Sequence, residues 1–174
     1  KAFTMAQMMG GKGEIYAFDL HEKRVKLIAG GAERLRLTNI KAMTGDASVY
    51  NEKLPKFSKI LCDVPCSGLG VIRRKPEIKY KNPSDFEGLP EIQYKIAENA
   101  LNYLEVGGEM VYSTCTLRRE ENEDIVLRFL SEHSDFEALD FTLGDIKSNG
   151  GMLTLYPHIH NTDGFFISKL RKKK

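Results

Sequence analysis

The stretch DVPCSGLG, residues 63–70, directly follows the apolar run Ile60-Leu61-Cys62. A continuous apolar run that ends at turn-forming residues is typical of a strand buried on both faces of a parallel sheet. This strand is expected to give way to a glycine-rich loop that carries Cys66. A second cysteine, Cys115, follows the predicted strand of residues 110–114, which begins with Met110-Val111-Tyr112. The sequence thus places two thiols directly after two predicted strands.

The rest of the chain alternates between short apolar strands and helical patterns. Helices are expected over residues 2–9, 22–37, 90–104 and 120–130, and strands over 15–18, 40–44, 59–64, 110–114 and 136–139. The glycine pair at residues 107–108 is expected to stop the third helix. Two last strands, over 152–155 and 165–170, are expected to form a hairpin-like pair. The alternation predicts a doubly wound α/β sheet, mostly parallel, with antiparallel strands at its C-terminal end.

Length and composition indicate one ordinary globular domain. The chain has 174 residues, of which 41% are apolar and 29% charged, and its net charge is +2. This charge is too small to indicate a nucleic-acid partner by itself. Three cysteines, without a signal peptide or a long apolar span, are typical of a reducing, cytoplasmic environment. We therefore expect no disulfide.

The basic residues are clustered. One group comprises Arg73, Arg74, Lys75, Lys79 and Lys81, and the other lies within residues 169–174. Such a group is either a solvated face or a surface for phosphate groups, and charge alone does not decide between the two.

Three acidic residues lie at or just after the ends of predicted strands: Asp19, Asp46 and Asp63. Ligands of open α/β sheets bind beyond the carboxyl ends of the strands, so these side chains are candidates to line a binding crevice. Asp19 is a candidate ligand of ribose hydroxyls. Alternatively, it caps the helix that begins near Glu22. Asp46 has the same two interpretations.

The glycine-rich run of residues 10–13 does not predict a phosphate-binding loop. A loop of that kind leads from a strand into a helix, whereas this one leads from a helix into a strand. No other glycine motif for a dinucleotide or for ATP is present. The sequence therefore does not support an enzyme that uses either.

The cysteines have different predicted roles. Cys62 lies inside an apolar strand and is expected to be a core residue. Cys66 and Cys115 are either small buried residues or two thiols directed at one substrate. A zinc site that includes His158 and His160 is disfavoured, because there is no C-x-x-C pair and no clustered third ligand. We therefore expect no metal.

Four motifs together resemble the Sun (Fmu) family of RNA cytosine-5 methyltransferases. They are DVPCSGLG, the following VIRRKPEIK, STCTLRREENED from residue 113 and DGFF from residue 163. The resemblance extends from Lys1 to Lys172 and is strongest to the bacterial small-subunit rRNA methyltransferases. It implies a Rossmann-like fold, S-adenosyl-L-methionine as cofactor and RNA, expected to be ribosomal, as substrate. We expect a monomer without membrane association.

The resemblance also implies roles for the acidic residues. Asp19 resembles the residue that binds the cofactor ribose, and Asp46 the residue beside the adenine. Asp63 resembles the residue that borders both cofactor and target base, and Lys1 the last residue of the cofactor loop. The basic residues after the Pro-Cys loop are expected to contact RNA phosphates: Arg73, Arg74, Lys75 and Lys79.

In the family pattern, Cys115 resembles the nucleophile and Cys66 the second cysteine, which assists product release. The chemistry agrees, because carbon 5 of cytosine attacks a methyl donor only after a thiolate has added to carbon 6. The carbon 5 proton must then leave to a base before the thiol can be eliminated. DNA cytosine-5 methyltransferases use the Pro-Cys cysteine as nucleophile, and the Thr-Cys motif favours the RNA type.

One departure concerns the beginning of the chain. The first strand of the family's sheet, its glycine-rich cofactor loop and its N-terminal RNA-binding region are expected to precede Lys1. Residues 1–174 are thus expected to be an N-terminally incomplete catalytic domain. The alternative is a non-catalytic RNA-binding or scaffold fragment of the same fold.

Overall fold

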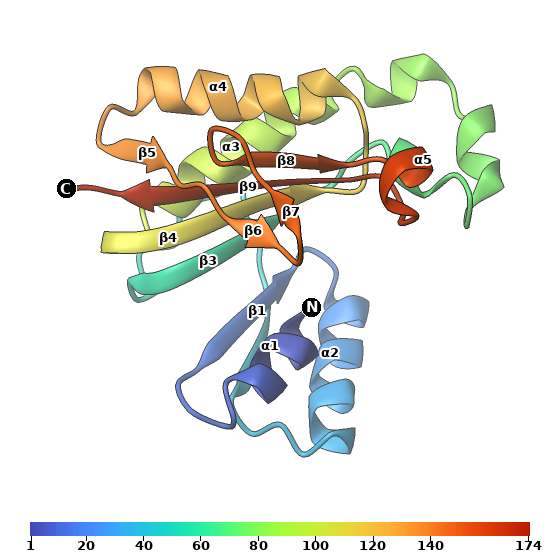
Figure 1. The fold of residues 1–174 in the computed structure, drawn as a ribbon. Coiled ribbons are helices and arrows are strands. Elements are labelled where there is room, and N and C mark those ends of the chain that lie inside the picture. The colour runs from blue at the N-terminus through green and yellow to red at the C-terminus, as the bar shows by residue number, and fades with distance from the viewer. The chain divides into compact units, whose positions relative to one another are not determined.

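The computed structural model describes all residues from 1 to 174. The chain divides into two compact units, Lys1–Val49 and Tyr50–Lys174. Figure 1 shows their elements. None of the helices combines the length and the apolar character needed to pass through a membrane.

The first unit contains two helices and two strands. They are α1 (Ala2–Met8), β1 (Ile15–Asp19), α2 (Glu22–Arg34) and β2 (Ile40–Thr44). The two strands pair in parallel, from Ile15 opposite Ile40 to Asp19 opposite Thr44. Their carboxyl ends therefore lie next to each other, and so do the loops that follow them.

The second unit is built around one five-stranded sheet. Its strands are β3 (Phe57–Asp63), β4 (Leu104–Thr114), β5 (Phe136–Ala138), β8 (Met152–Leu155) and β9 (Phe165–Lys172). The helices are α3 (Leu89–Leu101), α4 (Glu123–Glu132) and the short α5 (Pro157–His160). Four 3₁₀ turns occupy Leu69–Val71, Pro76–Tyr80, Pro83–Phe86 and Arg119–Glu121. A small hairpin, β6 (Thr142–Leu143) with β7 (Ile146–Lys147), lies between β5 and β8 in the chain.

The pairing of the strands confirms the predicted topology. β3 and β4 are parallel, and β9 runs antiparallel to β4. β5 and β8 both pair antiparallel with β9, β5 along residues 170–172 and β8 along residues 165–168. Four strands thus share one direction, and only the C-terminal strand runs against them.

The core of this unit lies between the sheet and helices α3 and α4, which Figure 1 shows on one side of the sheet. The largest fully buried apolar side chains are Tyr112, Phe129, Phe166, Leu104 and Met110. Complete burial of such a side chain contributes about 1.5–3 kcal/mol. The apolar residues of β4 alternate with half-buried ones, as expected for a central strand.

Several predicted boundaries were wrong. Helix α3 ends at Leu101, and Gly107 and Gly108 lie inside β4 instead of stopping the helix. Between the pairs Phe57–Leu104 and Lys59–Glu109 the register shifts, so that β4 contains a bulge there. Gly107 has a φ of 78°, a conformation that other residues rarely adopt. The hairpin β6–β7 and helix α5 were not predicted.

Candidate active site

The structure brings Cys66 and Cys115 together. Asp63 and Ser113 are partners in the parallel pair of β3 and β4, so the two cysteine loops start at the same edge of the sheet. The Sγ atoms of the cysteines are 3.2 Å apart, and the backbone N–H of Cys115 donates to Sγ of Cys66 over 3.3 Å. Both residues are half-buried thiols. This distance suits two groups that act on one bound atom.

The contact with Cys115 affects the protonation of Cys66. The hydrogen bond with Cys115, and next the burial of the side chain, raise the pKa of the Cys66 thiol well above its ordinary value of 9.0. At neutral pH, Cys66 therefore keeps its proton, and its S–H can donate to the sulfur of Cys115. A thiol that receives a hydrogen bond is better able to carry the negative charge of a nucleophile.

The Pro-Cys loop is held on both sides of Cys66. Glu121 is completely buried, and its Oε2 accepts hydrogen bonds from the backbone N–H of Ser67 and from Nε2 of Gln93, both over 2.9 Å. The same Nε2 donates to the carbonyl of Pro65 over 2.8 Å. The residues before and after Cys66 are thus both fixed by one buried pair of side chains.

The Thr-Cys segment is held in a similar way. The hydroxyl of Thr114 donates to Oδ1 of Asn122 over 2.5 Å, and Nδ2 of Asn122 donates to the carbonyl of Thr116 over 3.0 Å. The hydroxyl groups of Ser67 and Thr116 lie 2.7 Å apart and join the two loops. All these side chains are buried.

A third segment, which contains the DGFF motif, joins the two loops through backbone hydrogen bonds. The N–H of Gly70 donates to the carbonyl of Cys115 over 2.9 Å, and the N–H of Gly164 donates to the carbonyl of Gly70 over 2.7 Å. A Cβ atom on Gly70 would lie 2.1 Å from the Gly164 oxygen. Only glycine allows this approach. The guanidinium of Arg74 forms an ion pair with Asp163 over 2.6 Å.

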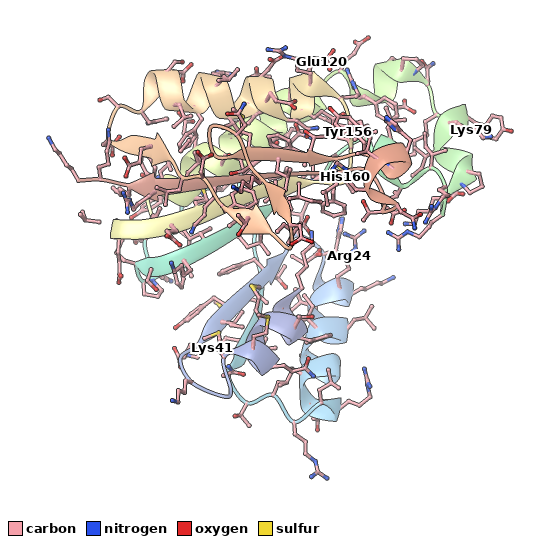
Figure 2. All side chains as sticks on the ribbon, viewed as in Figure 1. Arg24, Lys41, Lys79, Glu120, Tyr156 and His160 are labelled. Atoms are coloured by element: carbon pink, nitrogen blue, oxygen red, sulfur yellow. The ribbon has the colours of Figure 1, made fainter.

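The predicted RNA-binding residues differ in their surroundings. Arg73, Lys75 and Lys79 are exposed, and Figure 2 shows Lys79 on the outer side of its loop. Tyr80 is 82% exposed, and the Lys79 ammonium lies 5.7 Å from the centre of its ring. Arg74 is exposed too, but its ion pair with Asp163 offsets part of its charge.

The C-terminal basic group serves the sheet instead. Lys169 pairs with Glu109 over 3.1 Å, and Arg171 with Glu137. The ammonium of Lys172 lies 5.9 Å from the ring centre of Phe136. Opposite charges on neighbouring strands stabilise strand pairing. These contacts favour the interpretation of this group as a structural one.

The four predicted cofactor residues lie in both units. In the first, Asp19 accepts a hydrogen bond from the N–H of His21 over 2.9 Å, and Asp46 accepts two from Ser48, over 2.9 and 2.6 Å. The bonds from Ser48 lower the pKa of Asp46 below its ordinary value of 3.8. Lys1 is the residue before helix α1. In the second unit, Asp63 ends β3 and accepts from Ser113 over 3.4 Å.

Cys62 has the predicted core position. It lies in β3 with its Sγ 3.6 Å from Sδ of Met110, and burial raises the pKa of its thiol to about 12. Near α5, Nδ1 of His160 accepts a hydrogen bond from the N–H of Tyr156, whose ring stacks on the imidazole. Figure 2 shows both rings beside this helix.

The possible metal ligands that lie together are Glu98, Glu132 and His133, and this group contains neither cysteine of the pair. Glu132 already forms an ion pair with Arg128 over 3.1 Å and accepts a hydrogen bond from Tyr94. These partners account for its charge.

Sequence reasoning missed the roles of Gln93, Glu121 and Asn122 in holding the cysteine loops. The last two belong to the quoted stretch STCTLRREENED, but a run of charged residues ordinarily indicates a solvated surface. A usable signal was the helical spacing from Glu121 and Asn122 to the apolar Ile125 and Val126, which places all four on the buried side.

Residues 1–171 match the family of 16S rRNA methyltransferases RsmB/F. A protein of Bacillus subtilis described as a probable ribosomal RNA small subunit methyltransferase B is 44% identical over 182 residues. The ribosomal RNA small subunit methyltransferase F of Escherichia coli is 35% identical over 182 residues. Both alignments cover 99% of this chain, but 41% and 38% of those proteins. The chain thus spans about two fifths of the length of these relatives.

Solved structures confirm the fold. NSun6 from Pyrococcus horikoshii, determined with SFG, has a TM-score of 0.88 and is 33% identical, covering 99% of this chain and 45% of that one. A methyltransferase homolog from the same organism has a TM-score of 0.79 and is 33% identical, covering 97% of this chain and 56% of that one. The predicted Rossmann-like methyltransferase fold is therefore correct.

Proposed function

Because the chain belongs to the RsmB/F family of 16S rRNA methyltransferases, we propose that the complete protein methylates carbon 5 of a cytosine in ribosomal RNA. The observation that carries the proposal is the pair of thiols 3.2 Å apart, each near the beginning of a loop that follows a strand. Methylation of an oxygen or of an exocyclic nitrogen needs no thiol. Carbon 5 of cytosine does, because it is a poor nucleophile until carbon 6 has been attacked.

In the proposed reaction, the thiolate of Cys115 forms a bond to carbon 6 of the cytosine. The electrons of the 5,6 double bond then become available at carbon 5, which takes the methyl group. A base removes the proton from carbon 5, the double bond forms again, and the bond between sulfur and carbon 6 breaks. Cys66 is proposed to support this sequence: its sulfur lies 3.2 Å from that of Cys115, and an S–H donated from Cys66 would stabilise the Cys115 sulfur both before attack and as the leaving group.

S-adenosylmethionine is the cofactor of this fold family, and it supplies a methyl group bound to a positively charged sulfur. The first unit has acceptors that fit its adenosine half. The N–H of Gly45 donates to the carbonyl of Asp19 over 3.1 Å, which keeps the loops after β1 and β2 together. Asp46 uses only Oδ1 for Ser48, and carboxylate oxygens accept hydrogen bonds from hydroxyl and amine groups. This supports the proposal that Asp19 binds the ribose and Asp46 lies beside the adenine.

RNA is proposed to approach the exposed basic residues of the loop that follows Cys66. Arg73, Lys75 and Lys79 are the candidates for phosphate contacts, since Arg74 already has a carboxylate partner. Phosphate contacts position a nucleic acid without reading its sequence. These residues are therefore expected to add affinity for RNA without selecting the cytosine.

The experiment compares Cys66→Ala and Cys115→Ala in the complete protein, incubated with its RNA and S-adenosylmethionine. We expect Cys115→Ala to transfer no methyl group and to form no covalent product. Cys66→Ala should attack and methylate but release slowly, so that an RNA-linked protein survives denaturing electrophoresis. A linked product in Cys115→Ala alone would exchange the two roles. Full activity of both variants without a linked product would refute the thiol mechanism.

A further inference from the structure

Glu121 and Asn122 are adjacent in the chain, and each holds the flanks of a different cysteine. Glu121 accepts from Ser67, the residue after Cys66, and through Gln93 it also holds the residue before Cys66. Asn122 holds both neighbours of Cys115. Because the two side chains belong to consecutive residues, one short piece of backbone relates the two cysteine loops to each other.

We propose that Glu121 is a positioning residue that fixes the Cys66 thiol against the Cys115 thiol. It touches neither sulfur, and it acts through the backbone of Ser67 and through Gln93. The expected change in methylation rate rests on the proposed function. The expected change in the reactivity of the Cys66 thiol does not.

The charge of Glu121 strengthens its hold on the loop. Its side chain is completely buried, and the nearest cation is Arg118, whose Nη1 lies 3.6 Å from Oε1. That Oε1 atom accepts no hydrogen bond, so Oε2 alone fastens the loop. Hydrogen bonds to an ionised acceptor are about twice as strong as neutral ones. Replacement by glutamine keeps the shape and one acceptor oxygen, but it weakens both bonds and turns an amide towards a guanidinium or a backbone donor.

The first readout is the pH dependence of Cys66 alkylation, measured in the complete protein with iodoacetamide and mass spectrometry of the separated peptides. The hydrogen bond to Cys115 is the largest cause of the high pKa of Cys66. If Glu121→Gln releases the loop, that bond weakens and the pKa of Cys66 falls. We expect Cys66 to be alkylated up to about tenfold faster at pH 8, because the net contribution of one hydrogen bond changes an equilibrium by up to about this factor.

The matched control is Glu120→Gln. Glu120 precedes Glu121, has the same side chain and also faces Arg118, at 3.7 Å, but it is exposed and holds no cysteine loop. Figure 2 shows it at the surface. We expect the pH dependence of Cys66 alkylation in Glu120→Gln to equal that of the unchanged protein. Glu121→Asp keeps the charge, so Cys66 should be alkylated more slowly in this variant than in Glu121→Gln.

The second readout is steady-state methylation. Glu121 is buried and is not expected to meet RNA, so Glu121→Gln should lower kcat about tenfold or more with little change in the KM for RNA. An unchanged Cys66 profile in a folded Glu121→Gln protein, or an equal shift in Glu120→Gln, would overturn the inference. An inactive unchanged protein would instead count against the proposed function, and the alkylation profile would still decide on the role of Glu121.

Discussion

Replacement of Gly70 by alanine should separate the three segments that meet at the candidate active site. The new Cβ would lie 2.1 Å from the oxygen and 2.7 Å from the carbon of the Gly164 carbonyl, and 2.8 Å from the Cys115 oxygen. Ordinary contact begins near 3.4 Å. All three atoms belong to the backbone, so no side chain can rotate away, and the Gly164 carbonyl must move by more than 1 Å.

This movement puts at risk both backbone hydrogen bonds of Gly70, to Cys115 over 2.9 Å and from Gly164 over 2.7 Å. A net loss of about 1 kcal/mol for each bond, with about 1–3 kcal/mol for overpacking, gives a destabilisation of about 3–5 kcal/mol. The free energy of unfolding in urea measures it. Gly88→Ala is the control, because nothing lies within 4 Å of its Cβ position and its φ is −83°. If the free energy of unfolding of Gly70→Ala lay within about 1 kcal/mol of that of the unchanged protein, the predicted clash with the Gly164 carbonyl would be wrong.

Two further predictions concern charges outside the thiol pair. Glu109 accepts hydrogen bonds from Lys59 and Lys169. The bond from Lys59 is the largest cause that lowers the pKa of Glu109 below its ordinary value of 4.5. Glu109→Gln should therefore lower the free energy of unfolding by up to about 1 kcal/mol at pH 7. A group with a lowered pKa stabilises the fold above its ordinary pKa and loses this effect as the pH falls. The difference in unfolding free energy between Glu109→Gln and the unchanged protein, measured in urea, should therefore disappear below about pH 4.5. A difference that stays constant with pH would contradict the assignment. Arg73→Ala should reduce the slope of log K for RNA against log salt by about 0.7–0.9, as expected for one lost phosphate contact, whereas Arg171→Ala should leave it unchanged. Equal slopes for the unchanged protein, Arg73→Ala and Arg171→Ala would show that Arg73 makes no phosphate contact.

The approach of the two thiols could be predicted from the sequence, because it depends on a local pattern and on one general rule of parallel sheets. Cys66 and Cys115 each follow an apolar run, and neighbouring parallel strands end at one edge. The core position of Cys62 followed from the same run. Periodicity alone was sufficient for β2, whose bounds from Ile40 to Thr44 were predicted without error.

What could not be predicted depends on residues far apart in the chain. A glycine pair such as Gly107-Gly108 can end a helix or form a bulge, and here its pairing with β3, about fifty residues earlier, decides for the bulge. Glu121 is surrounded by charged residues and has its main partner, Ser67, 54 positions away. That Glu121 is buried follows only from the three-dimensional positions of the Pro-Cys loop and the Thr-Cys segment.

The support of both cysteines by one dipeptide has a consequence for how sequences of this kind can change in length. Six positions separate Cys115 from Glu121 and seven separate it from Asn122, and an insertion or deletion in this interval would detach both supports at once. The excursion between β5 and β8, that is the connecting segment of residues 139–151, contains only the hairpin β6–β7. This hairpin pairs with no strand of the main sheet. Gaps in alignments of related chains should therefore gather in that excursion and avoid the interval from Cys115 to Asn122.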